Sequence, residues 1–195
     1  MFDRNKFFEE SLLESAETKK SIIEHCRKDV FAAIDLIIVS VKSGGKIMFC
    51  GNGGSAADCQ HLATEFIIRL SHDLNRPSIG AIALTTDSSN LTAGANDIGY
   101  DNVFARSVEG LGRHGDVLIG ISTSGNSASV IKAMEMAKSK KIITIAFLGG
   151  SGGKMKGIAD VSVTIPSSNT QRIQEGHITV GHIICESVER ELYGK

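Results

Sequence analysis

The chain contains 195 residues, 42% of them apolar and 22% charged, which is typical of one globular domain and excludes a largely disordered chain. A formal net charge of −1 excludes a strongly basic nucleic-acid-binding protein, so we expect no nucleic acid among its partners. No apolar run approaches the ~18 residues of a membrane span, and no signal-peptide pattern follows Met1, so we expect a cytoplasmic protein without a membrane partner.

Two helices are expected before the first strand. Residues 7–26 have one apolar and one charged side, and residues 30–41 are apolar almost all round. Because a helix that is apolar on most faces is buried, we expect both helices to pack on something beyond their own domain, with a second subunit as one candidate. We place an N-terminal helical extension at residues 1–35 and the main domain at residues 36–195.

Short apolar runs then alternate with helical stretches. The expected strands are 46–50, 78–84, 116–121, 142–148 and 161–165. The expected helices are 56–70, 88–95 with 102–109, 128–140 and 170–193, with a short turn near Met155. Runs rich in Ile and Val, separated by helices, indicate a parallel sheet that is covered on both faces. The pattern therefore predicts an α/β fold, a three-layer sandwich with a central five-stranded parallel sheet.

The four cysteines are scattered along the chain without a CxxC pair. This spacing favours reduced, mostly buried thiols over disulfides. The residues are Cys26, Cys50, Cys59 and Cys185.

A glycine-rich turn follows the first expected strand. Gly51, Gly53 and Gly54 allow positive φ angles and a close approach to the backbone. Ser55 is a suitable N-cap for the next helix, and the free N–H groups of a helix start attract anions. The turn fits neither the GxGxxG nor the GxxxxGK[ST] pattern, so we expect neither a dinucleotide nor a P-loop nucleotide.

A second polar loop, residues 122–127, follows the third expected strand. It places four hydroxyl groups beside Gly125 at the start of a helix. Such a cluster can be an ordinary helix cap around a turn, but one cap needs only one of these residues. Since ligands of parallel sheets bind beyond the carboxyl ends of the strands, the four hydroxyls favour a phosphate site.

Four residues on two expected helices have side chains that suit a divalent metal. His61 and Glu65 share one helical face, although such a pair alone is usually an exposed ion pair. Gln174 and His182 lie about 80° apart around the last helix, so both can flank one face. Two imidazoles, a carboxylate and an amide oxygen make an acceptable tetrahedral set for zinc. The sequence does not show whether the two helices meet. His177 points elsewhere and is expected to be a surface or packing residue.

Several motifs, in this order, resemble those of the phosphoheptose isomerases, which belong to the sugar isomerase (SIS) domain superfamily. They are GNGGSAAD at 51–58 with His61 and Glu65, ANDIGY at 95–100, GISTSGNS at 120–127, and RIQE at 172–175 with His182. The resemblance covers nearly the whole chain. It implies a flavodoxin-like SIS domain and a cytoplasmic homotetramer with active sites between subunits. It also implies an aldose–ketose isomerase that converts sedoheptulose 7-phosphate to D-glycero-D-manno-heptose 7-phosphate, the first step towards the activated heptoses of surface glycans such as lipopolysaccharide.

The resemblance also implies site residues. One zinc ion per subunit would be held by His61, Glu65, Gln174 and His182. The sugar phosphate would contact twelve residues in five segments. These are Asn52, Gly53, Gly54, Glu65, Arg69, Asn96, Asp97, Ser122, Thr123, Ser124, Ser127 and Gln174.

The chemistry of the reaction agrees with this assignment. Moving a proton between adjacent carbons through an enediol requires a base and a second acid–base group. We expect Glu65 to be the base and His182 its partner, with Asp97 in support, while a bound metal would polarise the carbonyl.

Two other functions compete with the enzyme. A non-catalytic SIS-fold interaction protein of the replication-initiator-associating type need not keep His61, Glu65, Gln174 and His182, and this chain keeps all four. A sugar-phosphate-sensing domain is normally joined to a DNA-binding module, for which this chain has no room. Both observations favour the enzyme over these alternatives.

Overall fold

The computed structural model describes residues 1–194 and contains a five-stranded sheet in the order β2-β1-β3-β4-β5. All neighbouring strands are parallel, and β1 and β3 are buried at every position. The strands are β1 (Ile47–Gly51), β2 (Ala81–Ala83), β3 (Val117–Ser122), β4 (Ile143–Gly149) and β5 (Val161–Ile165). The predicted α/β sandwich with a five-stranded parallel sheet is confirmed.

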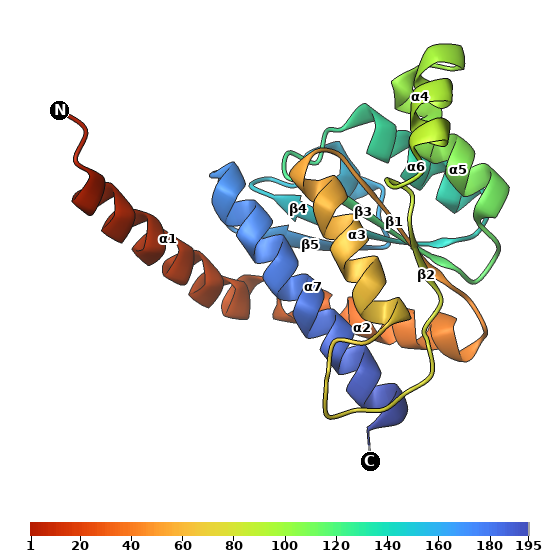
Figure 1. The fold of residues 1–195 in the computed structure, drawn as a ribbon, viewed down its shortest axis with the longest axis horizontal. Coiled ribbons are helices and arrows are strands. Elements are labelled where there is room, and N and C mark those ends of the chain that lie inside the picture. The colour runs from red at the N-terminus through yellow and green to blue at the C-terminus, as the bar shows by residue number, and fades with distance from the viewer. Residues whose placement is uncertain (195) are drawn as a thin grey trace.

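Helices cover both faces of the sheet (Figure 1). One face carries α2 (Arg27–Lys42), α3 (Gly54–Ile67) and α7 (Thr170–Tyr193). The other carries α5 (Val103–Leu111), α6 (Ala128–Ser139) and the short η2 (Lys154–Gly157). Side chains of successive strand residues point to opposite faces of the sheet and pack in different hydrophobic cores. Phe49 packs with the first group of helices and Met48 with the second.

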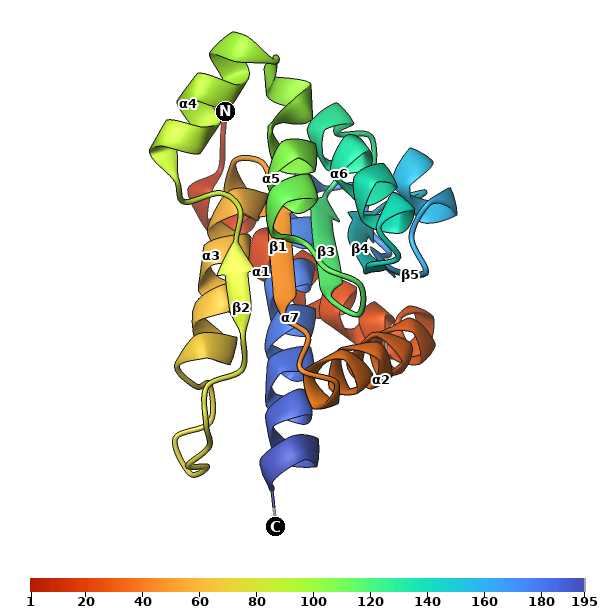
Figure 2. The ribbon, with the colours of Figure 1, turned by 90° about the vertical axis from the view of Figure 1, so that its right-hand side faces the viewer.

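Between β2 and α5 the chain forms α4 (Ser88–Asp97) and η1 (Tyr100–Asn102). Helix α4 projects past the carboxyl ends of β2 and β1 (Figure 2). Its start is capped by Asp87, whose carboxylate accepts a hydrogen bond from Asn90 N. This arrangement places α4 beside the loops in which we expect the ligand.

For two elements, the difference from the predicted bounds has a clear physical cause. Strand β2 covers 81–83 instead of 78–84, because the backbone before it pairs with α3: Ile79 N donates to Phe66 O at 3.1 Å. Helix α3 begins at Gly54, with Gly53 as its N-cap at φ 56°, so Ser55 lies in the first turn. A glycine caps this helix because the turn after β1 needs a positive φ, which costs glycine little.

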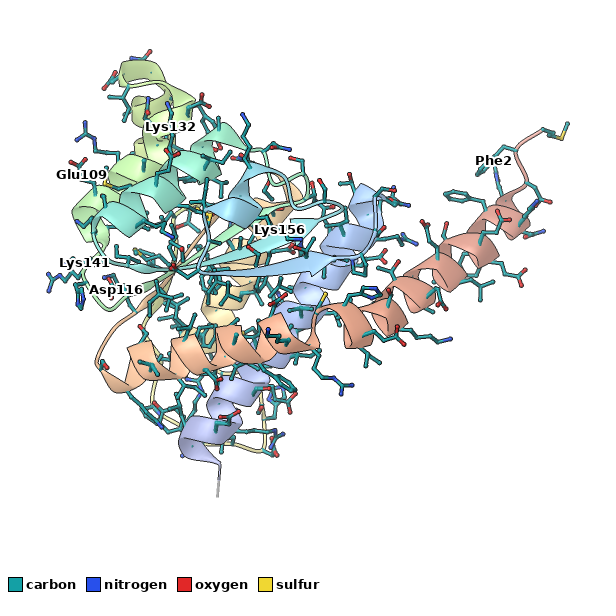
Figure 3. The ribbon with its side chains drawn as sticks, turned by 180° about the vertical axis from the view of Figure 1, so that it is seen from behind. Phe2, Glu109, Asp116, Lys132, Lys141 and Lys156 are labelled. Atoms are coloured by element: carbon teal, nitrogen blue, oxygen red, sulfur yellow. The ribbon has the colours of Figure 1, made fainter. Side chains whose placement is uncertain are left out.

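The first helix, α1 (Arg4–His25), projects from the body of the molecule (Figure 1). Phe2 marks its distant end in Figure 3. Along the projecting part Phe8 is 68% exposed and Leu13 is 61% exposed, whereas Ile22 near its end is buried in the main core. The chain thus presents a long apolar surface that it does not cover itself. The division at residues 35 and 36 falls within α2 and stays a prediction.

All four cysteines are free and buried, as predicted. Burial raises the pKa of Cys50 to about 12, which keeps this thiol protonated and unreactive at neutral pH. Within residues 1–194, no helix combines the length and the apolar character that crossing a membrane would require.

Candidate active site between helices α3 and α7

Helices α3 and α7 lie side by side and run in the same direction over one face of the sheet (Figure 1). Near the start of both helices the amide of Gln174 lies against Gly54. Near their ends Leu70 N, just after α3, donates to Glu189 of α7 at 2.9 Å. The two helices that carry the predicted metal ligands therefore meet within one chain.

A glycine sets the distance between the helices at their centre. A methyl group on Gly181 would lie 2.6 Å from Leu62 Cδ2, so a larger residue fits here only if Leu62 or one of the helices shifts. The residues beside this contact are His61 on α3 and His182 on α7. Their Nε2 atoms lie 2.7 Å apart, and the ring centroids lie 4.9 Å apart.

Glu65 completes a cluster with the two histidines. Its Oε1 lies 3.2 Å from His61 Nε2, and one ligand atom from each of the three residues lies within 4.8 Å of the others. The side chain of His61 is 48% exposed and that of Glu65 is 16% exposed, so the cluster is open to solvent on one side. Two imidazole nitrogens and a carboxylate oxygen, accessible and close together, are a donor set that fits zinc, which leaves room for further ligands.

Gln174, the fourth predicted ligand, lies against the start of α3, where its amide contacts Gly54. Gly54 precedes His61 by seven residues, about two turns, so the Gln174 contact and the cluster lie on the same side of α3. The structure thus brings His61, Glu65 and His182 together, and the role of Gln174 as a ligand stays a prediction.

Asp58 is a carboxylate near the cluster that the sequence analysis missed. It lies one turn before His61 on α3, and its Oδ2 atom is buried without a hydrogen-bond partner among residues 1–194. Burial raises the pKa of Asp58, and the nearby His61 imidazole opposes this shift.

The loops after β1 and β3 meet through Asn52. Its Nδ2 donates to Ser127 Oγ at 2.7 Å and to Ser129 Oγ at 3.0 Å, while its Oδ1 accepts from the Tyr100 hydroxyl at 2.6 Å. These loops lie where the strand order reverses between β1 and β3, the usual ligand crevice of such sheets. No sequence signal assigned a role to Ser129, and Tyr100 was only the last residue of a motif.

The serine-rich loop has mixed roles. Ser122 Oγ accepts from Gly125 N at 3.1 Å, and Ser124 Oγ accepts from Asn126 N at 3.2 Å, so two of the four hydroxyls already stabilise the turn. Ser127 is the N-cap of α6 but its side chain makes no capping hydrogen bond. The expectation of a structured turn is thus confirmed, and the phosphate site stays a prediction.

The remaining predicted contacts are spread around these loops. Gly53 and Gly54 are exposed at the start of α3, and Thr123 is half-buried. Asn96 and Asp97 end α4, where Asn96 Nδ2 donates to Asp97 Oδ1 at 2.7 Å. Asp97 lines a hollow of about 400 Å³ between α4 and α5 and is not a member of the histidine–glutamate cluster. Arg69 is exposed just after α3.

Comparison with known proteins points to one family. Residues 12–149 match the SIS domain family. The chain is 52% identical to a phosphoheptose isomerase of Chlorobium phaeobacteroides over 197 residues, covering 98% of this chain and 87% of that protein. It is 55% identical to phosphoheptose isomerase 2 of Campylobacter jejuni over 159 residues, covering 82% of this chain and 78% of that protein.

Solved structures agree with the sequence comparison. A phosphoheptose isomerase from Neisseria gonorrhoeae superposes with a TM-score of 0.90 at 40% identity, covering 95% of this chain and 98% of that one. Another from Francisella tularensis gives a TM-score of 0.92 at 30% identity, covering 97% of this chain and all of that one.

Proposed function

The chain belongs to the SIS domain family and, within it, to the phosphoheptose isomerases, and from this premise we propose that it converts D-sedoheptulose 7-phosphate to D-glycero-D-manno-heptose 7-phosphate. The product is the first intermediate towards nucleotide-activated heptoses for surface glycans. The observation that carries the proposal is the cluster of His61, Glu65 and His182, assembled from two helices on the scaffold of this family.

We assign the metal site to the same cluster. His61, Glu65 and His182 would hold one zinc ion per subunit, with Gln174 as the fourth ligand by resemblance. Zinc, when bound, polarises the carbonyl group of the substrate. The Nε2 atoms of the two imidazoles, 2.7 Å apart, are close enough that both could bind the same ion.

Glu65 and His182 supply the proton transfers. The Glu65 carboxylate removes a proton from C1 of the ketose, and the electron pair forms the enediol while the C2 oxygen gains a proton. Delivery of a proton to C2 and loss of the O1 proton then give the aldose. His182 is suited to the transfers between the oxygens because imidazole accepts and donates protons near neutral pH. We keep Asp97 in a supporting role by resemblance.

The loops at the carboxyl ends of β1 and β3 would hold the substrate. Asn52 and the exposed glycines beside it suit the sugar chain, because side-chain amides bind hydroxyl groups and glycines allow close approach. Hydroxyl groups of residues 122–127 suit the phosphate, with Asn96 and Arg69 as further contacts.

We also propose that the chain acts in the cytoplasm as a homotetramer. The uncovered apolar side of α1, with Phe8 and Leu13 exposed, supports self-association because such a surface is costly in water. The resemblance to tetrameric isomerases supplies the subunit number. We retain the division into an extension at residues 1–35 and a SIS domain at residues 36–195.

Two variants test the catalytic assignment. Glu65→Gln and His182→Gln should abolish isomerisation, while circular dichroism and the melting temperature show that the fold persists. Glu186→Gln is the matched control, because Glu186 is an exposed α7 residue that pairs with Arg190. Turnover at the wild-type rate in either site variant would remove that residue from its role.

The alternative of a non-catalytic interaction protein gains nothing from these relatives, which are named as isomerases. It would be favoured only if the purified wild-type chain, with and without zinc, left sedoheptulose 7-phosphate unchanged.

A further inference from the structure

Glu189 is a carboxylate buried within the fold near the end of α7. It is fully buried, three N–H groups donate to it, and the Arg76 guanidinium forms an ion pair with it. Leu70 N lies 2.9 Å from its Oε1 and Ser71 N lies 3.0 Å from its Oε2. Arg76 adds Nε at 2.8 Å and Nη2 at 2.7 Å, both to Oε1. Burial alone would raise the pKa of Glu189, but these hydrogen bonds outweigh it and lower the pKa.

Arg76 also reaches the end of α3 that carries Glu65. Its side chain is 0% exposed, and its Nη2 donates to the backbone carbonyl oxygen of Glu65 at 2.8 Å. Its Nη1 donates to Pro77 O at 2.9 Å. One guanidinium therefore ties together α3, the loop that follows it and α7, through bonds in directions that only its planar fork provides.

The Arg76–Glu189 pair lies on the same side of α7 as the metal-ligand cluster. Glu189 lies seven residues after His182, two turns along the same side of α7. Glu189 binds the loop after α3 at Leu70, which directly follows Arg69, a predicted sugar contact. The pair thus fixes the segments that carry Glu65, Arg69 and His182 relative to each other.

We propose that Arg76 and Glu189 are positioning residues: they lock α3 and its following loop against α7 so that Glu65 and His182 face a common metal ion. This inference rests on the proposed function, whose metal site it explains. Stability alone does not explain this pair, because an apolar pair of the same volume is often as stabilising as a buried ion pair. An apolar pair would leave Leu70 N and Ser71 N without partners, so the ion pair supplies the fixed geometry of the loop.

The test compares zinc affinity, measured by competition with a chromophoric chelator, in the wild type and three variants. Arg76→Lys keeps the positive charge but loses the fork, and Glu189→Gln keeps the shape but loses the negative charge. Asp116→Asn is the control, because the buried Asp116 also forms a close ion pair, with Lys46 at 2.5 Å, but near the amino ends of the strands (Figure 3). All three variants are expected to melt at lower temperature than the wild type.

We expect zinc affinity to fall by roughly 10- to 100-fold in Arg76→Lys and Glu189→Gln, which is the usual effect of losing a residue that orients metal ligands. Affinity should be unchanged in Asp116→Asn. Excess zinc should restore turnover in Arg76→Lys and Glu189→Gln. Wild-type affinity in both of these variants, or an equal loss in the control, would overturn the inference. Zinc binding by the wild type without turnover would instead remove the proposed function and leave the positioning role standing.

Discussion

Replacing Gly181 by alanine perturbs the contact that brings the two site helices together. The added methyl group would lie 2.6 and 2.8 Å from the two terminal carbons of Leu62, whereas carbon atoms in contact prefer about 3.5–4.0 Å. Leu62 is 1% exposed and packed in the main core, so it has little room to move. We therefore expect the helices to separate locally by up to about 1 Å.

The expected cost has two parts of opposite sign. Overpacking a core contact costs about 1–3 kcal/mol. Alanine in place of glycine within a helix returns about 1 kcal/mol. We therefore expect the Gly181→Ala variant to fold with a loss of about 0–2 kcal/mol in the free energy of unfolding.

The effect on the cluster should be larger than the effect on stability. His61 and His182 each adjoin the contact, and metal ligands tolerate displacements of only about 0.2 Å. We expect zinc affinity to fall at least about tenfold, measured by chelator competition beside a melting curve. The double variant Leu62→Ala/Gly181→Ala removes the clash and should recover most of the affinity while staying less stable. Wild-type affinity in Gly181→Ala would show that side-chain rotations absorb the shift and would refute the reasoning.

Three further predictions concern the site, the core and the surface. Gly54→Ala should displace the flexible amide of Gln174 and weaken zinc binding in chelator competition, with almost no change in melting temperature; unchanged affinity would remove Gln174 from the metal site. His177 is buried, and burial lowers its pKa to about 4, so the folded state binds fewer protons than the unfolded state between pH 6.5 and 4. Stability should therefore fall by about 2 kcal/mol between pH 7.5 and pH 5, and His177→Gln should lose this component in urea titrations. Leu13→Asp should yield smaller oligomers in light scattering, and an unchanged mass would contradict the role given to α1.

The fold could be predicted because its strands are continuous apolar runs. A strand covered on both faces reads the same way all along, so β1, β3, β4 and β5 stood out clearly. Only the edge strand β2 was overestimated, since the apolar segment around Ile79 pairs with α3 instead of the sheet. Local sequence does not report such a competing partner. His177, expected as a surface or packing residue, is a packing residue whose Nε2 lies 2.9 Å from Leu148 O.

The site was predictable only in pieces. Spacing placed His61 with Glu65 and left their meeting with His182 open, because no local pattern encodes a contact between residues 121 positions apart. Gly181 decides that meeting, yet a glycine inside a helix looks like an ordinary weak position. The link from Asn52 to Ser129 was missed for the same reason.

The central claim, that this chain isomerises a heptose phosphate, is tested most directly by following sedoheptulose 7-phosphate with the purified wild-type protein by NMR. We predict that signals of D-glycero-D-manno-heptose 7-phosphate grow until the two sugars reach equilibrium. A spectrum that stays unchanged, with zinc and without it, would contradict the account.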